Sequence, residues 1–367
     1  MSRSGLVQAL SPALVERWDA LALSTGAPPF MRPGWLLPWA DAFGRTDALQ
    51  LVTVERGGEL VAALPVLAGP LSLRSSTNQE TALYRPLSVG PDATAELAER
   101  LLATRRQLID MAAVDLGDPG VVAVREAADR ARVGVLVRPM RRSPFIDVSG
   151  DPAAFLRGLS KNRRHGLKRL RSRMAEAGTV EFDVRDGREN LAALLDEGWR
   201  LEAREWKVAV GSAVLSSPAA VAFYRAATGW AAGEGLLRLM FLRVSGQAIG
   251  FGLCLRHGST LSFLKLGMDD AHAKLGPGVV LTQHLIDYAF ADPELRELDL
   301  LGDNESYKAD LASGTREQAR VMLFPGRAGP ALRGSVEAAA RTRSALVSRL
   351  SDDTRRRLST VRNRLRR

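Results

Sequence analysis

The sequence has 367 residues, of which 46% are apolar and 25% are charged, and its 51 basic and 41 acidic residues give a net charge of +10. At about 100–200 residues per domain, this length predicts two or three domains. The composition is typical of a globular protein and excludes wholesale disorder and collagen-like repeats.

Cysteine and histidine are scarce, with one and four residues respectively. A single cysteine excludes a disulfide framework and a multi-cysteine metal site, and we expect no metal. Cys254, inside the apolar stretch FGLCLR, is expected to be a core thiol. No apolar run reaches the roughly 18 residues that cross a bilayer, and charges follow the first residues too closely for a secretory signal. We therefore expect a cytoplasmic protein.

The positive charge is concentrated in two segments. Residues 152–175 contain six arginines and two lysines with no acid, and residues 333–367 contain eleven arginines against three acids, so each segment carries +8. The rest of the chain therefore carries −6. Because basic surfaces attract phosphate-bearing partners, each segment is interpreted separately below.

The first 142 residues are predicted to form one α/β unit. Helical spacing predicts a helix over 12–23 and a second helix that places Trp35, Leu36 and Trp39 on one face. Two strands flank the glycine pair at 57–58, which is typical of a hairpin turn. Further strands and helices follow, and the prolines of PMRRSPF predict a linker near residue 142.

Residues 143–328 are predicted to form a second unit. A basic helix pair ends at Gly178 and is followed by a strand, two helices and three consecutive strands between 236 and 267. A helix then begins at a Gly-Pro-Gly sequence, followed by a strand, a short helix over 304–311 and a last strand. Together the two halves predict a mixed α/β fold, with a mixed sheet flanked by helices in each unit.

Residues 329–367 are predicted to form a basic amphipathic tail, because leucine, valine and alanine recur there at helical spacing. One interpretation is a solvated helix packed loosely on the body. The other is an element that rests on an anionic membrane surface or on nucleic acid.

The strand–loop–helix segment over 262–290 carries the strongest chemical signal. Its helix begins at Gly276, Pro277 and Gly278, where free N–H groups bind anions and glycine lets a phosphate approach the backbone. A three-strand meander precedes this segment and a strand–helix pair follows it. This is the order of the acyl-CoA-binding half of GCN5-related N-acetyltransferases.

Five blocks in order resemble the CelD/BcsL-type acetyltransferases, a FemAB-like branch of that fold. The blocks are ELVAALPV, FLRGLSKNRRHGLKRLRSRMAEAG, EAREWKVAVGSA, LKLGMDDAHAKLGPGVVL and LDLLGDNESYKADLA, within residues 50–325. The resemblance implies two tandem acetyltransferase-like units with acyl-CoA as co-substrate. The chain departs from the family pattern at Met268, His272, Ala273 and Gly276, so CoA, an acyl carrier and aminoacyl-tRNA all stay open as donors.

N-acyl transfer needs a base for the amine, a donor for the thioester oxygen and an acid for the thiolate. The resemblance implies that backbone N–H groups of the strand LSFLKLG hold the carbonyl and that Tyr307 is the acid. Asp269, just past a strand end, is a candidate base, and Lys265 a candidate for stabilising developing charge. Their structural alternatives are a half-buried tyrosine, a turn residue and an exposed lysine.

The remaining candidates bind the two substrates. Around the start of the helix, the donor-binding candidates are Lys274, Gly276, Pro277, Gly278 and Val279. The acceptor-binding candidates are Glu202, Trp206, Lys207, Lys308, Arg163 and Arg164. Packing of the tryptophan in the core and solvation of the charged groups are the competing interpretations.

We therefore expect a cytoplasmic acyltransferase, peripheral to the inner face of the membrane, that moves an acetyl or longer acyl group from acyl-CoA to an amine, with a sugar hydroxyl as the alternative acceptor. The resemblance implies a role in cell-envelope or exopolysaccharide biosynthesis, with a small-molecule or lipid-linked acceptor. Two alternatives stay open. One is aminoacyl transfer from tRNA to a peptidoglycan precursor, and the other is a non-catalytic membrane-surface module of a polysaccharide synthase.

Overall fold

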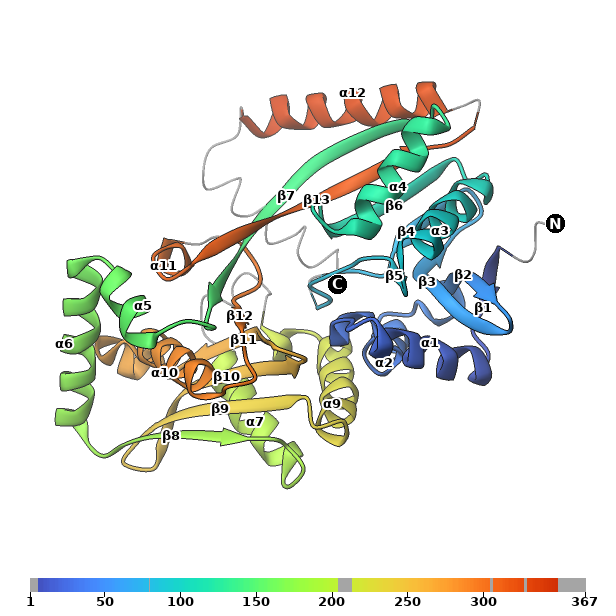
Figure 1. Ribbon diagram of the computed structural model, residues 1–367. Coiled ribbons are helices and arrows are strands. Elements are labelled where there is room, and N and C mark those ends of the chain that lie inside the picture. Colours follow the sequence, from blue (N-terminus) through green and yellow to red (C-terminus); the bar gives the residue numbers. More distant parts are fainter. Residues whose placement is uncertain (1–5, 79, 204–212, 304–305, 327–328, 349–367) are drawn as a thin grey trace. The chain divides into compact units, whose positions relative to one another are not determined.

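The computed structural model describes residues 6–78, 80–203, 213–303, 306–326 and 329–348. The chain forms two compact units: residues up to 141 group with those from 317 onward, and residues 142–316 form the second unit. The sequence-based division assigned 317–328 to the second unit, whereas these residues group with the first. The predicted mixed α/β fold, with a sheet and flanking helices in each unit, is confirmed (Figure 1).

The first unit has a sheet in the strand order β1-β2-β3-β4-β6-β13-β7, with β5 paired to β3. Strands β4 and β6 are parallel, and β13 is antiparallel to β6. Its elements are β1 (Val7–Ala9), α1 (Pro12–Ser24), η2 (Pro29–Met31), α2 (Pro33–Ala42), η3 (Thr46–Ala48), β2 (Leu49–Arg56), β3 (Glu59–Ala68), β4 (Ser72–Ser75), β5 (Leu87–Ser88), α3 (Pro91–Ala103), β6 (Leu108–Asp115), α4 (Pro119–Arg130), part of β7 (Gly134–Asp147), part of β13 (Gly314–Phe324) and α12 (Gly329–Ser348).

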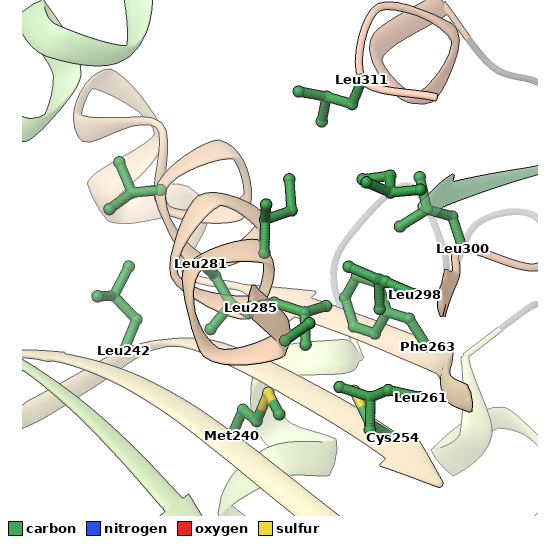
Figure 2. Packing of buried hydrophobic residues seen from close by; sticks show 14 of the residues in the cluster. Met240, Leu242, Cys254, Leu261, Phe263, Leu281, Leu285, Leu298, Leu300 and Leu311 are labelled. Atoms are coloured by element: carbon green, nitrogen blue, oxygen red, sulfur yellow. The ribbon is translucent and has the colours of Figure 1, made fainter. Parts of the chain in front are cut away.

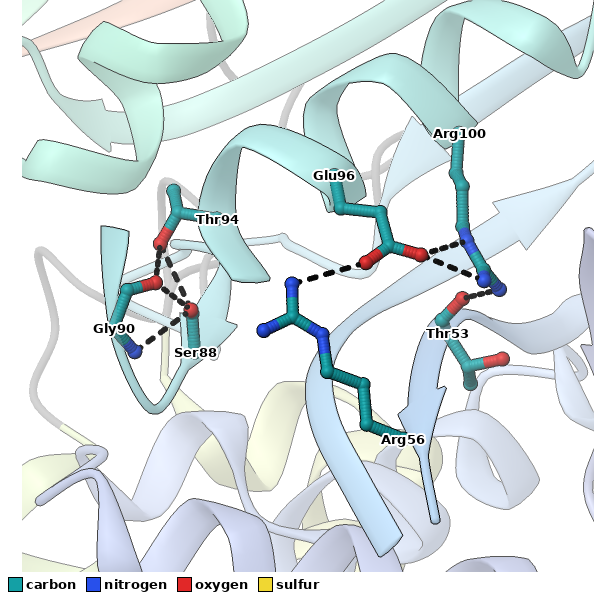
Figure 3. A network of polar contacts seen from close by, with 7 residues as sticks. All are labelled: Thr53, Arg56, Ser88, Gly90, Thr94, Glu96 and Arg100. Atoms are coloured by element: carbon teal, nitrogen blue, oxygen red, sulfur yellow. Dashed lines mark hydrogen bonds and ion pairs between the residues drawn. The ribbon is translucent and has the colours of Figure 1, made fainter. Parts of the chain in front are cut away.

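Local sequence signals explain much of this unit. Gly57 and Gly58 both have positive φ, 61° and 87°, as the tight turn between β2 and β3 requires. Helix α3 is tied to this hairpin by a polar network (Figure 3). Glu96 accepts hydrogen bonds from Arg56 at 3.1 Å and from Arg100 at 2.8 Å, and Arg100 also donates to the carbonyl of Thr53 at 2.9 Å.

The linker predicted from Pro139 and Pro144 is wrong, because both prolines lie inside strand β7, which runs unbroken over 14 residues. Proline removes a single N–H group, so a strand can continue through it where that group is not needed in the ladder. Strand β7 and strand β13 each pass from one unit into the other.

The second unit has a sheet in the order β7-β12-β11-β10-β9-β8, in which β11 and β12 are parallel and the other pairs antiparallel. Its elements, besides parts of β7 and β13, are α5 (Pro152–Gly158), α6 (Lys161–Ala177), β8 (Val180–Arg185), α7 (Leu191–Glu202), η4 (Val214–Ser216), α9 (Pro218–Gly233), β9 (Leu237–Val244), β10 (Gln247–His257), β11 (Thr260–Met268), η5 (Asp270–Leu275), α10 (Pro277–Ala291), β12 (Glu297–Asp299) and α11 (Ser306–Ala309).

Helix α10 packs on one face of this sheet and helices α7 and α9 pack on the other. Leu281 and Leu285 of α10 belong to a buried cluster with side chains of β9, β10, β11 and β12 (Figure 2). On the opposite face, the Trp199 ring of α7 lies 5.2 Å from the Tyr224 ring of α9 and 5.6 Å from the Phe251 ring of β10. The sheet therefore separates a mainly aliphatic cluster from a layer in which aromatic rings pack on one another. As expected, Cys254 is fully buried in the aliphatic cluster.

The described part of the tail forms helix α12 in the first unit. Arg138 of β7 donates a hydrogen bond to the carbonyl of Val336 at 3.0 Å, so the helix has at least one specific contact with that unit. No helix of the described ranges is both long and apolar enough to cross a membrane.

Candidate functional site

Strands β11 and β12 separate and form a fork in the second unit. They pair at only three positions, ending at Ser262 and Asp299. Strand β11 then continues to Met268, with β10 as its partner on the other side. Beyond Ser262, the edge of β11 that faces β12 pairs with no strand of the described part. An open strand edge presents backbone N–H groups to a bound carbonyl oxygen.

A β-bulge lies at the fork. In the β10–β11 ladder, Leu253 pairs with Lys265 and Cys254 with Phe263, which leaves Leu264 as the extra residue. A bulge bends its strand and increases the local twist. The backbone of β11 therefore turns at the position where its parallel partner ends, and the fork is built into the strand itself.

Helix α10 begins beside the end of β11. Gly276 adopts a left-handed conformation with φ 63° and ψ 48°, and its carbonyl accepts hydrogen bonds from Val279 and Val280 at 3.0 and 3.1 Å. A Cβ atom at Gly276 would lie 2.9 Å from Leu170 of α6, and one at Gly278 would lie 3.2 Å from the sulfur of Met268. Gly276 is thus favoured by its left-handed backbone, and Gly278 by close packing against Met268, whatever ligand binds there.

The predicted donor-binding residues lie together at this helix start. Pro277 and Gly278 are buried, Val279 is half-buried, and Lys274 is exposed in the last turn of η5. A side chain at Lys274 can therefore reach a ligand in solvent, whereas the two buried residues can contribute only backbone.

Asp269 has local hydrogen-bond partners for both carboxylate oxygens. Oδ1 accepts from the backbone N–H of Ala271 at 3.0 Å, which caps η5, and Oδ2 lies 2.9 Å from Nδ1 of His272. These bonds fix the loop between β11 and α10. As a base, Asp269 would take up a proton on an oxygen that already accepts one hydrogen bond.

Glu202 and Lys265 lie on the sheet face covered by α7 and α9. Glu202, at the end of α7, is 1% exposed and accepts a hydrogen bond from the backbone N–H of Val214 at 2.9 Å. The Nζ of Lys265 lies 5.2 Å from the centre of the Tyr224 ring. Helix α7 approaches β11 so closely that a Cβ at Gly267 would lie 2.7 Å from the backbone nitrogen of Glu202. Trp206 and Lys207 lie outside the described residues.

Asp299, which sequence analysis did not single out, ends β12 at the fork. It is 3% exposed, accepts a hydrogen bond from the backbone N–H of Leu301 at 2.9 Å, and has Arg316 at 3.7 Å. Burial raises the pKa of Asp299 to about 6, although the Leu301 N–H and Arg316 favour the carboxylate. A carboxyl group with a pKa near neutrality at an open strand edge is a candidate general base.

The turn after β12 holds two further candidates. Leu301 has a positive φ of 47°, which is strained for a residue with a side chain. Lys308 of α11 donates a hydrogen bond from Nζ to the Leu301 carbonyl at 3.0 Å, which holds the turn beside Asp299. Tyr307 belongs to α11, but its side chain lies outside the described part of the chain.

Arg163 and Arg164 lie in the first turn of α6, which is capped by the hydroxyl of Ser160. Nη1 of Arg164 donates to the carbonyls of Arg157 and Leu159 at 2.7 and 2.5 Å, at the end of α5. Arg164 therefore connects α5 to α6. In the described ranges, no group of three or more His, Cys, Asp or Glu side chains is arranged to hold a metal ion.

Comparison with known families identifies the segment that contains the fork. Residues 161–309 match the family described as the acetyltransferase (GNAT) domain. This matched segment, which covers less than half of the chain, is called the GNAT domain. The fork and the start of α10 both lie inside it. The sequence matches no curated protein. The narrower resemblance to CelD/BcsL-type enzymes stays a prediction.

Solved structures share the fold over most of the chain. The C-terminal domain of a protein assigned as a lysylphosphatidylglycerol synthetase from Agrobacterium fabrum is 13% identical with a TM-score of 0.55, over 92% of this chain and 97% of that one. L-PGS from Bacillus licheniformis is 11% identical with a TM-score of 0.53, over 89% and 95% of the two chains. FemX is 12% identical with a TM-score of 0.52, over 86% and 96%. At these identities, the likeness concerns the fold alone.

Proposed function

We propose that the GNAT domain transfers an acyl group from acyl-CoA to an amine. The observation that carries this proposal is the fork, where the bulged edge of β11 lies open beyond Ser262, next to the start of α10. A thioester carbonyl laid along this edge would receive backbone N–H donors, and the anionic part of the donor would lie near Lys274 and the helix start.

In the proposed reaction the amine nitrogen attacks the thioester carbon, the N–C bond forms and the C–S bond breaks. Asp299 accepts the proton that the amine must lose, with Asp269 as the second candidate base. Tyr307 gives its proton to the departing sulfur, and Lys265 stabilises developing negative charge. Asp299 is favoured as the base because it ends β12 at the fork and burial raises its pKa to about 6.

We propose that Glu202 and Lys265, on the face of α7 and α9, and Lys308, beside the turn after β12, are the candidate contacts of the acceptor. Trp206 and Lys207, in the segment that follows α7 in the sequence, complete this set. Arg163 and Arg164 are the candidates for a phosphate on the acceptor. A small-molecule or lipid-linked precursor of the envelope or of an exopolysaccharide fits this charge. The basic tail would hold the chain at the inner face of the membrane.

The charge of α5 and α6 favours a second donor, aminoacyl-tRNA. Residues 152–175 carry eight cations and no acid, and most of these side chains are exposed. Such a surface attracts a phosphate backbone of any sequence. In this case the same fork would hold the ester carbonyl of the aminoacyl group.

Binding and turnover of the two donors by the full-length chain test the proposal. An acyl-CoA present at a hundredfold excess over its Kd should stabilise the fold by about 2.7 kcal/mol, which a thermal-shift series detects. Lys274→Gln should weaken that effect, whereas the matched change Lys161→Gln, on the exposed start of α6, should not. Turnover with aminoacyl-tRNA but not with acyl-CoA would establish the second donor. Absence of binding and turnover with both would reject an enzymatic role.

A further inference from the structure

A pocket of about 320 Å³ lies among α5, α6 and α10, and Arg164, a candidate contact for the acceptor, is one of its lining residues. Figure 1 shows α6 beside α5 and α10. This volume is at the lower end of the range of small-molecule sites, about 300–1,000 Å³. The lining residues are Leu156, Arg164, Leu167, Lys168, Arg171, Ser172 and Gln283.

Gln283, one of the lining residues, carries a buried hydrogen-bond acceptor. Its side chain is 3% exposed, and its Oε1 has no hydrogen-bond partner among the described residues. Its Nε2 donates to Oδ1 of Asp287 at 2.9 Å, and Arg171 donates to Oδ2 of the same carboxylate at 2.5 Å. Because an ionised carboxylate only accepts hydrogen bonds, the amide cannot be reversed, and Oε1 stays on the side away from Asp287.

Buried polar atoms are nearly always hydrogen-bonded in proteins, so this carbonyl oxygen needs a donor, which a water molecule or a ligand hydroxyl group can supply. Gln283 lies on α10 while most of the lining lies on α6, so the pocket exists only where the two helices pack.

Cations stand at the opening of the pocket. Lys168 is exposed and has no carboxylate partner among the described residues, and Arg171 pairs with Asp287 but keeps 46% of its side chain exposed. Nη1 of Arg164 donates its hydrogen bonds to carbonyls at the end of α5. The positive charge of Arg164 still contributes to the electrostatic potential of the pocket. Leu156 and Leu167 supply the apolar wall, and Leu156 is 38% exposed. An anion next to an apolar part matches this lining.

We propose that this pocket binds a phosphate ester that carries a hydroxyl group beside the phosphate, as in glycerol or sugar phosphates. The phosphate contacts Lys168 and Arg171, the hydroxyl donates to Oε1 of Gln283, and the carbon skeleton lies on Leu156 and Leu167. Free esters and lipid head groups share this chemistry, and both are included in the test.

Glycerol 3-phosphate and methyl phosphate are the matched probes, because at pH 8 only the first has hydroxyl donors. Calorimetry on the full-length chain should show glycerol 3-phosphate binding about tenfold more tightly, the size of one net hydrogen bond. Gln283→Met should remove this preference and bring the two affinities together. Thermal unfolding of the variant shows whether it is folded.

Lys168→Gln should weaken both probes about tenfold, whereas Lys161→Gln, the same charge change on the same helix but outside the pocket, should leave them unchanged. If both lysine variants lost the same affinity for the probes, the attraction would come from the overall charge of the helix, and the proposed binding site would be refuted. Equal affinities of the two probes for the wild-type chain would overturn the role of Gln283, and no binding at millimolar concentration would overturn the proposal.

Vesicles with phosphatidylglycerol identify the source of the ligand. Vesicle binding that Lys168→Gln weakens and Lys161→Gln does not would assign the pocket to a lipid head group. Vesicle binding equal in both variants, with glycerol 3-phosphate still bound through Lys168, would assign it to a free ester. Because binding is measured directly, the result holds whether or not the chain transfers acyl groups.

Discussion

Replacing Asp299 with asparagine should stabilise the protein near neutral pH and slow its reaction. Burial raises the pKa of Asp299 from 3.8 to about 6. At a pH between 3.8 and about 6, the carboxyl group of Asp299 is protonated in the folded chain and ionised in the unfolded chain. Stability therefore falls as pH rises from about 4 to about 6, and the whole penalty remains above that range. A shift of about two units corresponds to a penalty on the order of 3 kcal/mol.

Asparagine keeps an oxygen for the Leu301 N–H and carries no charge at any pH, so the variant should lose this pH dependence. Part of the gain is offset because Arg316 loses one carboxylate neighbour, although it still pairs with Glu297. The expected result is a Tm about 3–6 °C above wild type at pH 7.5, with little difference at pH 4. Loss of the base should lower turnover by about 10²–10⁴-fold.

The assay is differential scanning fluorimetry of both proteins from pH 4 to pH 8, with steady-state turnover over the pH range where both are folded. Asp310→Asn, the same change at an exposed acid of the neighbouring α11 loop, is the control and should alter neither curve. A variant that is less stable at every pH would refute burial as the cause of the raised pKa. Unchanged turnover with acyl-CoA would refute Asp299 as the base.

Three further predictions concern other parts of the chain. Tyr307→Phe should lower kcat and kcat/KM together by about 10²–10⁴-fold and leave acyl-CoA binding nearly intact, and unchanged turnover would assign the residue to packing. Glu202→Ala should cost about 1–3 kcal/mol in chemical unfolding, because the buried N–H of Val214 loses its acceptor, and an unchanged midpoint would contradict this. Deleting residues 333–367, with a net charge of +8, should abolish binding to anionic liposomes at low salt and spare turnover of soluble substrates, and equal liposome binding would contradict a membrane role for the tail.

Elements with strong local signals could be predicted from the sequence. The Gly57–Gly58 hairpin and helix α10 depend on turn and cap residues that act within a few positions, and they form where expected. Strand β7 shows the limit of such signals, because proline at two positions does not prevent pairing that other parts of the chain supply. Proline disfavours a strand locally, but pairing with neighbouring strands of the sheet can outweigh this preference.

The properties of Asp299 could not be predicted because they come from distant segments. Its neighbours in the ladders are Ser262 on β11 and Phe145 on β7, and Arg316 comes from β13. The sequence shows only an acid at the end of an apolar strand. Its burial, and hence its raised pKa, follows from three segments that meet only in the folded chain. The same holds for Gln283, because the pocket beside it forms only where α6 packs against α10.

The Gly-Pro-Gly sequence and the fork differ in how much they say about function. The left-handed backbone of Gly276 and the close packing of Gly278 against Met268 favour glycine even if no ligand bound at the helix start, so the motif alone does not discriminate between a cap and a donor site. Packing gives no such reason for β12 to end at Asp299 while β11 continues with a bulge at Leu264. An open strand edge exposes unpaired backbone N–H and C=O groups, to which a ligand can hydrogen-bond. The functional inference therefore depends on the fork. The two glycines support it only because the helix start lies beside the fork.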